Sequence, residues 1–223
     1  MSRQLTIAID GPAGAGKSTV AKRLAKELGL SFLDTGAMYR CLALKCIRHG
    51  ISADDGDQAG LLGQTTSIAF EPGDPQRVLL DGEDVTEAIR RPEVGDFASA
   101  VSVHSPVRRV LASQQQQIVA QGGYTLEGRD TTTVIAPTAP VRIFLTASID
   151  ERAKRRFTEL HERGVEVSLE EIKAQIEERD HRDSTRADSP LRIAEGVQVI
   201  ETDGMSIDQV LETIKSLAEA ALP

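Results

Sequence analysis

The sequence predicts an α/β fold with a parallel β-sheet core flanked by helices, because short apolar strands alternate with amphipathic helices along the chain. A glycine-rich turn between the first strand and the first helix is a second observation that favours this class. The third is the length of 223 residues, which is enough for one or two domains and a substantial core. In such folds, ligands collect at the carboxyl ends of the strands.

The first strand is predicted at residues 5–10, an apolar and β-branched run, and the first helix ends at a C-cap formed by Gly29. The turn between them matches G-x-x-x-x-G-K-[ST] at each fixed position. With the threonine that follows, it comprises Gly11, Pro12, Ala13, Gly14, Ala15, Gly16, Lys17, Ser18 and Thr19. A chance match is the alternative, but a strand before the motif and a helix after it are the context that a phosphate-binding loop requires.

This loop has the chemistry to bind the phosphates of ATP. Its glycines let backbone N–H groups point inward, and the helix that follows adds partial positive charge at its N-terminus. Lys17 would reach the outer phosphates, and the hydroxyl of Ser18 would hold Mg²⁺. The motif therefore predicts ATP binding with Mg²⁺ in a P-loop NTPase architecture, without specifying the reaction.

The second strand is predicted at residues 31–34, and a helix follows over residues 35–48 with Thr35 as its N-cap. Since this helix begins at the carboxyl edge of the sheet, we expect Thr35, Tyr39 and Arg40 to lie near the phosphate-binding loop.

Residues 51–64 predict a loop and a short helix, and the chain then changes character. Residues 67–70, 77–80 and 83–85 have strand composition and turn residues between them, which predicts a small antiparallel sheet inserted in the α/β chain. An irregular surface insertion is the alternative.

The remaining elements return to the α/β pattern. Helices broken by prolines cover residues 86–121, and strands follow at 124–126 and 141–145. A charged helix begins after Ser148, and a capping box at Ser168 opens another helix. The last strand is predicted at 196–202 and the last helix begins after Ser206.

Composition excludes several classes of protein. The net charge of −8 argues against general binding of nucleic acid or of anionic membranes, and aromatic residues make up only 3%. No apolar run is long enough to span a membrane, and the first residues lack the pattern of a cleavable signal. Cys41 and Cys46 are expected to be buried thiols. These observations predict a cytoplasmic enzyme.

Two absent motifs narrow the classes of nucleotide-binding protein to which the chain could belong. The chain has no N-K-x-D guanine-binding motif, and the strand at 141–145 ends in Thr146 rather than in the Asp of a motor or transporter ATPase. Small-molecule kinases need neither feature but need arginines that close over the phosphoryl group. Arg179, Asp183 and Arg186 crowd the end of a charged helix, where such a lid is expected. A switch or regulatory ATPase that binds a protein partner remains the alternative from another class.

The chain resembles bacterial cytidylate kinases, which are nucleoside monophosphate kinases with an adenylate-kinase-like fold. The resemblance runs nearly end to end. It rests on the sequences at residues 9–17, 33–40, 80–85, 127–130, 141–145 and 178–186. Two positions depart from the pattern, since Thr35 stands where serine is expected and Thr132 where glycine is expected.

This resemblance implies ATP-dependent phosphorylation of CMP and dCMP by a cytoplasmic monomer, with Mg²⁺ and with no nucleic acid or membrane partner. It also implies roles for individual residues. Lys17, Arg152 and Arg156 would act on the ATP phosphates; Arg40 and Arg129 would hold the acceptor phosphate; Thr35, Arg109, Asp130 and Arg186 would recognise cytosine; Ser99, Arg179 and Asp183 would contact the pentose. A kinase for another small acceptor, such as another nucleotide or shikimate, is the alternative within enzymes.

The same resemblance implies a division of the chain into three parts. The core would comprise residues 1–60, 100–150 and 190–223, the acceptor-binding subdomain about 61–99, and a helical lid about 151–189.

Overall fold

The computed structural model describes residues 5–71, 73, 76–162 and 164–221. The chain divides into two compact units, of which the first comprises Met1–Phe32 and Val119–Pro223 and the second Leu33–Ile118. No helix in the described part of the chain is long and apolar enough to cross a membrane.

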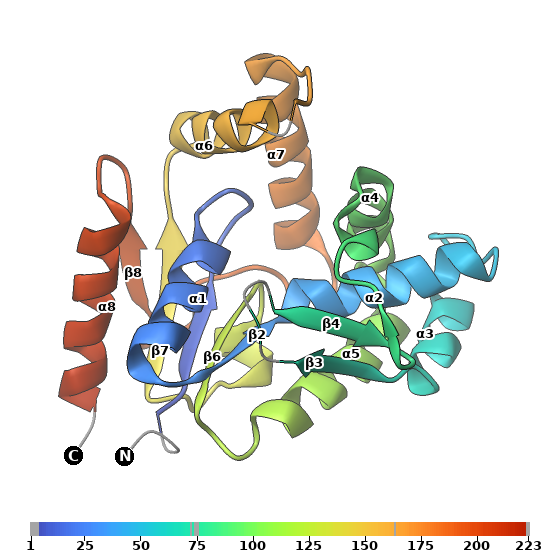
Figure 1. Ribbon diagram of the computed structural model, residues 1–223, viewed down its shortest axis with the longest axis horizontal. Helices are drawn as coiled ribbons and strands as arrows, with labels where there is room; N and C mark the ends of the chain where they lie inside the picture. The colour runs from blue at the N-terminus through green and yellow to red at the C-terminus, as the bar shows by residue number, and fades with distance from the viewer. Residues whose placement is uncertain (1–4, 72, 74–75, 163, 222–223) are drawn as a thin grey trace. The chain divides into compact units, whose positions relative to one another are not determined.

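The first unit is organised around a parallel sheet (Figure 1). Its order is β2 (Ser31–Asp34), β6 (Tyr124–Gly128), β1 (Ile7–Asp10), β7 (Val141–Thr146) and β8 (Gln198–Glu201). Strand β1 lies in the middle, with Ile7 opposite Thr125 on one side and Val141 on the other. The predicted parallel α/β core is therefore confirmed, and the loop after β1 opens at the carboxyl edge of the central strand.

Helices α1 (Lys17–Leu28) and α8 (Ile207–Ala221) pack on each other and bury an aliphatic core against the sheet. Ile7, Leu24 and Ile143 in this core are fully buried. Gly29 ends α1 with a left-handed backbone (φ 65°), and its N–H donates to the carbonyl of Ala25. Both the first helix and its predicted glycine C-cap are confirmed.

Helices α6 (Ile149–Glu162) and α7 (Leu169–Thr185) follow β7 and pack on each other (Figure 1). They bury a small cluster of their own, in which Ala153 and Ile172 are almost inaccessible. Helix α7 begins with the predicted capping box, because Ser168 accepts from the backbone of Glu171 and the side chain of Glu171 accepts in return.

One element of the first unit was not predicted. After β6 the chain forms a π-helical turn, η2 (Thr131–Ile135), in which the N–H of Ala136 donates to the carbonyl of Thr131 at 2.8 Å. Such turns are rare and occur mostly at functional sites. This one follows the Arg129-Asp130 pair directly.

The second unit contains the predicted antiparallel sheet, ordered β3-β4-β5. Ile68 on β3 lies opposite Leu80 on β4, which confirms the insertion. Residues 72, 74 and 75, where a turn was predicted, lie outside the described residues. The elements of this unit are α2 (Thr35–Arg48), α3 (Gly56–Gln64), β3 (Ile68–Glu71), β4 (Arg77–Leu80), β5 (Glu83–Asp84), η1 (Ala88–Arg90), α4 (Pro92–Val101) and α5 (Ser105–Val119).

The start of α2 corrects one prediction. The N-cap is Asp34, whose carboxylate accepts from the backbone N–H of Ala37 at 2.9 Å, and Thr35 is the first helical residue. An aspartate and a threonine in sequence both suit the cap position. The aspartate takes it here, and the Thr35 side chain, 4% exposed, is buried instead.

Candidate active site

The phosphate-binding loop depends on glycines at positions that other residues cannot occupy. Gly11 has a φ of 152°, and a Cβ there would lie 1.9 Å from the carbonyl oxygen of Leu145. Gly14 has a φ of 76°, and its Cβ would lie 3.1 Å from the Cβ of Arg152. The loop therefore passes close to β7 and α6, and only glycine permits both approaches.

Lys17 is 5% exposed and donates through Nζ to the carbonyl of Pro12 at 2.7 Å. Burial, reinforced by the positive charges of Arg129 and Arg179, lowers the pKa of Lys17 to about 7, although Glu127 and Asp10 oppose the shift. A buried ammonium with a depressed pKa gains from any anion brought beside it. The loop is thus set to receive negative charge at Lys17.

The hydroxyl of Ser18 donates to Oε1 of Glu127 at 2.5 Å. Glu127 is the next-to-last residue of β6, the strand beside β1, and is 7% exposed. A hydroxyl and a carboxylate together fit Mg²⁺, which proteins hold through one or two carboxylates with substrate phosphates completing the octahedron. The sequence analysis did not select Glu127 because it sought an acidic residue after the strand at 141–145. The short strand predicted at 124–126, directly before Glu127, was the signal that could have found it.

Among the described residues, no group of three or more His, Cys, Asp and Glu side chains could hold a metal ion.

A charged network lies between β6 and the end of α7. Asp183 accepts from Nε of Arg129 at 2.8 Å and from Nη1 of Arg186 at 3.2 Å, and its side chain is 8% exposed. Burial opposes ionisation, but Arg129, Arg179 and Arg186 together lower the pKa of Asp183. Arg186 also donates from Nε and Nη2 to the carbonyl of Ser189, at 2.9 and 2.8 Å. The structure therefore brings Arg129, Asp183 and Arg186 together.

Asp130 follows Arg129 and is 3% exposed. Its backbone carbonyl accepts from Val134 at 2.8 Å and from Ile135 at 3.2 Å, and the bond from Ile135, five residues on, begins the π-helical turn. The next two residues, Thr131 and Thr132, each donate both their backbone N–H and their hydroxyl to the carboxylate of Asp10, at 2.7 to 2.8 Å. Thr132, the departure from the family pattern, thus fits the turn and adds a hydrogen bond that glycine lacks.

The two predicted lid arginines have different surroundings. Arg152 is 8% exposed and donates to the carbonyls of Ala13 and Ala147, both at 2.9 Å. Arg156 lies on the outer face of α6, where it pairs with Glu159 at 2.8 Å and its side chain is 45% exposed. The structure therefore joins Arg152, but not Arg156, to the phosphate-binding loop.

Arg155 is a second residue that sequence reasoning did not select. It donates to the hydroxyl and the carbonyl of Thr202, and a Cβ at Gly16 would lie 3.8 Å from its Nη1. Its signal in the sequence was its place between Arg152 and Arg156 in one arginine-rich helix.

Arg179, a predicted site residue on α7, is exposed and acts electrostatically on both Lys17 and Asp183.

The other predicted site residues belong to the second unit. Arg40 pairs with Asp34 at 2.7 Å, and the buried Thr35 lies on the same helix. Ser99 is on α4, which packs on α2, whereas Arg109 is an exposed residue of α5.

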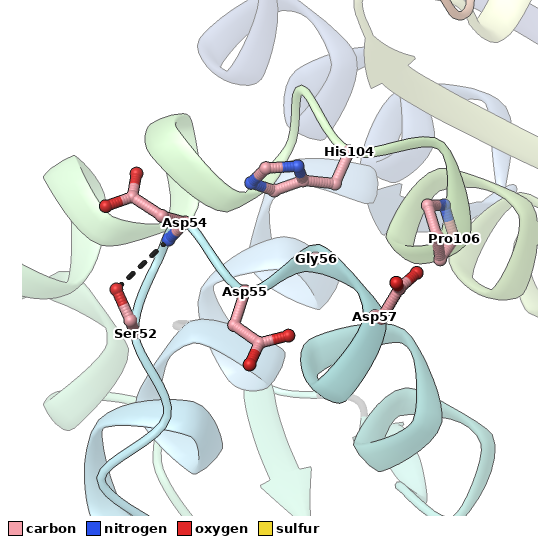
Figure 2. Close-up of a pocket in the computed structure, with 7 residues that line it drawn as sticks. All are labelled: Ser52, Asp54, Asp55, Gly56, Asp57, His104 and Pro106. Atoms are coloured by element: carbon pink, nitrogen blue, oxygen red, sulfur yellow. Dashed lines mark hydrogen bonds between the residues drawn. The ribbon is translucent and has the colours of Figure 1, made fainter.

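A hollow of about 460 Å³ in the second unit is lined by none of the predicted site residues. Figure 2 shows the side chains around it. Asp55 is the N-cap of α3 and accepts from the backbone and side chain of Gln58, while His104 bonds the carbonyl of Ala53 at 2.9 Å. These contacts explain the two side chains as supports of α3 and its preceding turn.

Comparisons with known proteins identify the family of the chain. A cytidylate kinase of Listeria monocytogenes is 46% identical and aligns over 98% of both chains. A cytidylate kinase of Syntrophotalea carbinolica is 49% identical over 95% of this chain and 91% of that protein. An uncharacterized protein from Eubacterium ventriosum shares the fold, with a TM-score of 0.56 at 13% identity over 97% of this chain and 99% of that one. The family model for cytidylate kinases matches residues 7–220, and the chain belongs to this family.

Proposed function

We propose that this protein transfers the γ-phosphoryl group of ATP to CMP and dCMP, which forms CDP and dCDP together with ADP. The observation that carries the proposal is the pairing, in one unit, of a complete phosphate-binding loop with a buried network of Arg129, Asp183 and Arg186. The loop suits a nucleoside triphosphate, and the network suits a second, anionic substrate. The relatives named above carry the same activity in their names.

Positioning and charge neutralisation are the main demands of phosphoryl transfer. Lys17 would stabilise negative charge on the transferred group, while Arg40 and Arg129 hold the acceptor phosphate in line with it. Because the second pKa of such a phosphate is about 6, the acceptor is mostly ionised at neutral pH and needs no dedicated base. Ser18 and Glu127 would hold Mg²⁺, which neutralises charge on the triphosphate when it is bound.

The proposed base-reading residues discriminate by hydrogen bonding. Cytosine offers an amine donor and two acceptors, N3 and O2, so Asp130 would accept from the amine while Arg109 or Arg186 donates to the acceptors. Uracil would set a carbonyl against Asp130 and an N–H against an arginine. Two mismatches of about 1–3 kcal/mol each give a preference of at least about tenfold for CMP. Thr35 would add a contact to the base, and Ser99, Arg179 and Asp183 would contact the pentose.

We further propose that the enzyme acts as a monomer in the cytoplasm, with these nucleotides as its partners. The residue roles proposed above depend on neither the oligomeric state nor the compartment.

The test is a coupled assay of ATP consumption with CMP, dCMP, UMP, AMP and shikimate as acceptors. The proposal predicts rapid turnover that depends on CMP or dCMP and produces the diphosphate. Preferred use of another acceptor would identify a different small-molecule kinase. Slow ATP hydrolysis that ignores every acceptor would instead indicate a switch or regulatory ATPase.

The same assay tests base reading with Asp130→Asn, whose amide can donate to O4 of uracil. We expect loss of CMP activity and a fall in the ratio of kcat/KM for CMP to that for UMP. An unchanged ratio in folded protein would remove Asp130 from base recognition and leave Thr35, Arg109 and Arg186.

A further inference from the structure

Asp180 on α7 lies at the point where both lid helices meet the phosphate-binding loop. Its Oδ1 accepts from the backbone N–H of Ala13 at 3.0 Å, and its Oδ2 forms an ion pair with Arg152. Arg152 in turn donates to the carbonyl of Ala13 at 2.9 Å. One loop residue is therefore held through its N–H by α7 and through its C=O by α6.

The junction is buried and closely packed as well as polar. The side chains of Arg152 and Asp180 are 10% and 21% exposed, so their attraction is less screened than that of a surface pair. Arg152 also donates to the carbonyl of Ala147 at the end of β7, which anchors the guanidinium from a third direction. The backbone of Gly14 passes so close to α6 that a Cβ would lie 3.1 Å from the carbonyl of Arg152.

A second ion pair between the same two helices provides a comparison. Lys173 of α7 pairs with Asp150 of α6 at 2.5 Å, with side chains 37% and 63% exposed. It joins the helices to each other, and its contacts among the described residues include no atom of the loop. Asp150 therefore helps to hold the two lid helices together, whereas Asp180 attaches them to the loop.

We propose that Asp180 is a positioning residue for the ATP side of the reaction, which rests on the proposed function only in taking ATP as the phosphoryl donor. Its charge keeps Arg152 against the loop and its Oδ1 fixes the Ala13 amide, so the lid helices and the phosphate cradle share one geometry. Loss of that charge releases Arg152 and loosens the cradle before ATP binds. ATP use then weakens, whereas CMP use does not.

The test compares Asp180→Asn with the matched control Asp150→Asn in the full-length protein. The asparagine at 180 keeps an oxygen that can accept from Ala13 but carries no charge for Arg152. We expect the KM for ATP to rise about tenfold, as for loss of one charge-assisted hydrogen bond. The KM for CMP should stay within twofold, and Asp150→Asn should change neither value. Asp180→Glu, which keeps the charge, should recover part of the loss.

Calorimetric titration of each variant with Mg-ATP, without CMP, measures the same effect independently of the acceptor. It therefore tests Asp180 even if the chain phosphorylates something other than CMP. Three results would overturn the proposal: Asp180→Asn matching Asp150→Asn, an equal loss toward ATP and CMP, or tighter ATP binding, which would mean that the carboxylate competes with phosphate. If Asp180→Asn does not fold, Asp180→Glu alone must still weaken ATP binding more than Asp150→Asn does.

Discussion

Two buried carboxylates of the first unit have opposite surroundings. Asp10, at the end of β1, is inaccessible and receives four hydrogen bonds from neutral donors of Thr131 and Thr132. Asp183, near the end of α7, lies between the guanidinium groups of Arg129 and Arg186. Burial raises the pKa of Asp10 despite its four donors, whereas three nearby arginines overcome burial and lower the pKa of Asp183.

The difference distinguishes Asp10, a carboxylate that ties two parts of the fold together, from Asp183, a carboxylate in a site suited to binding charged groups. The carboxylate of Asp10 joins the entry of the phosphate-binding loop to the turn after Asp130, through Thr131 and Thr132. Asp183 holds the guanidinium groups of Arg129 and Arg186 together in a buried place, and the carboxylates of Glu127 and Asp180 also act on Arg129. Because guanidinium groups suit bidentate binding of a phosphate, we assign this region to the acceptor.

Both regions act on the ammonium group of Lys17. Burial lowers its pKa, Arg129 lowers it further, and Asp10 opposes the shift. This ammonium should matter most in the transition state, where charge develops on the transferred group. We therefore expect Lys17→Met to lower kcat by about three orders of magnitude or more. A variant within threefold of wild type would contradict the assignment of Lys17.

Replacement of the Asp10 carboxylate by an amide should mainly reduce stability. Asp10→Asn turns an amide donor toward hydroxyl and amide donors, and each mismatched buried group costs about 1–3 kcal/mol. We expect the free energy of unfolding in urea to fall by about 3 kcal/mol. Asp150→Asn, which alters an exposed ion pair, should cost far less. Equal losses in the two variants would remove the special role of the Asp10 tie.

The pH dependence should distinguish the two carboxylates by sign. Asp183 has a pKa below the ordinary 3.8, so its stabilisation is present above that pH and is lost as the pH falls through the lower value. Asp10 has a raised pKa, so its contribution is greatest below 3.8 and declines as the pH rises through the higher value.

Urea unfolding of wild type, Asp10→Asn and Asp183→Asn between about pH 3 and 7 measures these contributions. The gap between wild type and Asp183→Asn should narrow toward low pH, and the gap for Asp10→Asn should widen. Parallel curves would mean that the two carboxylates share one environment.

The smallest expected effect concerns one hydroxyl. Thr132→Val keeps the shape of the side chain but removes the bond to Asp10, which should lower the free energy of unfolding by about 1–2 kcal/mol. Thr133→Val is the control, because the Thr133 hydroxyl donates instead to the Asp130 carbonyl, at 3.3 Å. Neither change should alter kcat/KM for CMP by more than about twofold.

The sequence allowed prediction of the regular elements because their signals are local. The strand at 31–34 and the capping box at Ser168 agree with the structure to the residue. The N-cap of α2 was wrong by one residue because Asp34 and Thr35 are both good capping residues, and only the fold decides between them.

The contacts of the site could be predicted less well, since they join distant parts of the chain. Nothing near Asp10 in the sequence points to Thr131, which is 121 positions away and lies in a rare type of turn. The bond between Ser18 and Glu127 likewise spans 109 positions. Arg129 was selected by resemblance to a family pattern, and Asp183 and Arg186 also by their place at the end of a charged helix. Their pairing with one another became evident only in the fold.

The contrast between the two carboxylates is tested most directly by the KM for CMP and the affinity for Mg-ATP in Asp183→Asn and Thr132→Val. We predict that Asp183→Asn raises the KM for CMP at least about tenfold, because Arg129 and Arg186 lose the charge that orients them. Mg-ATP affinity without CMP should stay within twofold, and Thr132→Val should change neither quantity. A folded Asp183→Asn variant with an unchanged KM for CMP, or one that weakens ATP binding equally, would contradict the assignment of the charged network to the acceptor.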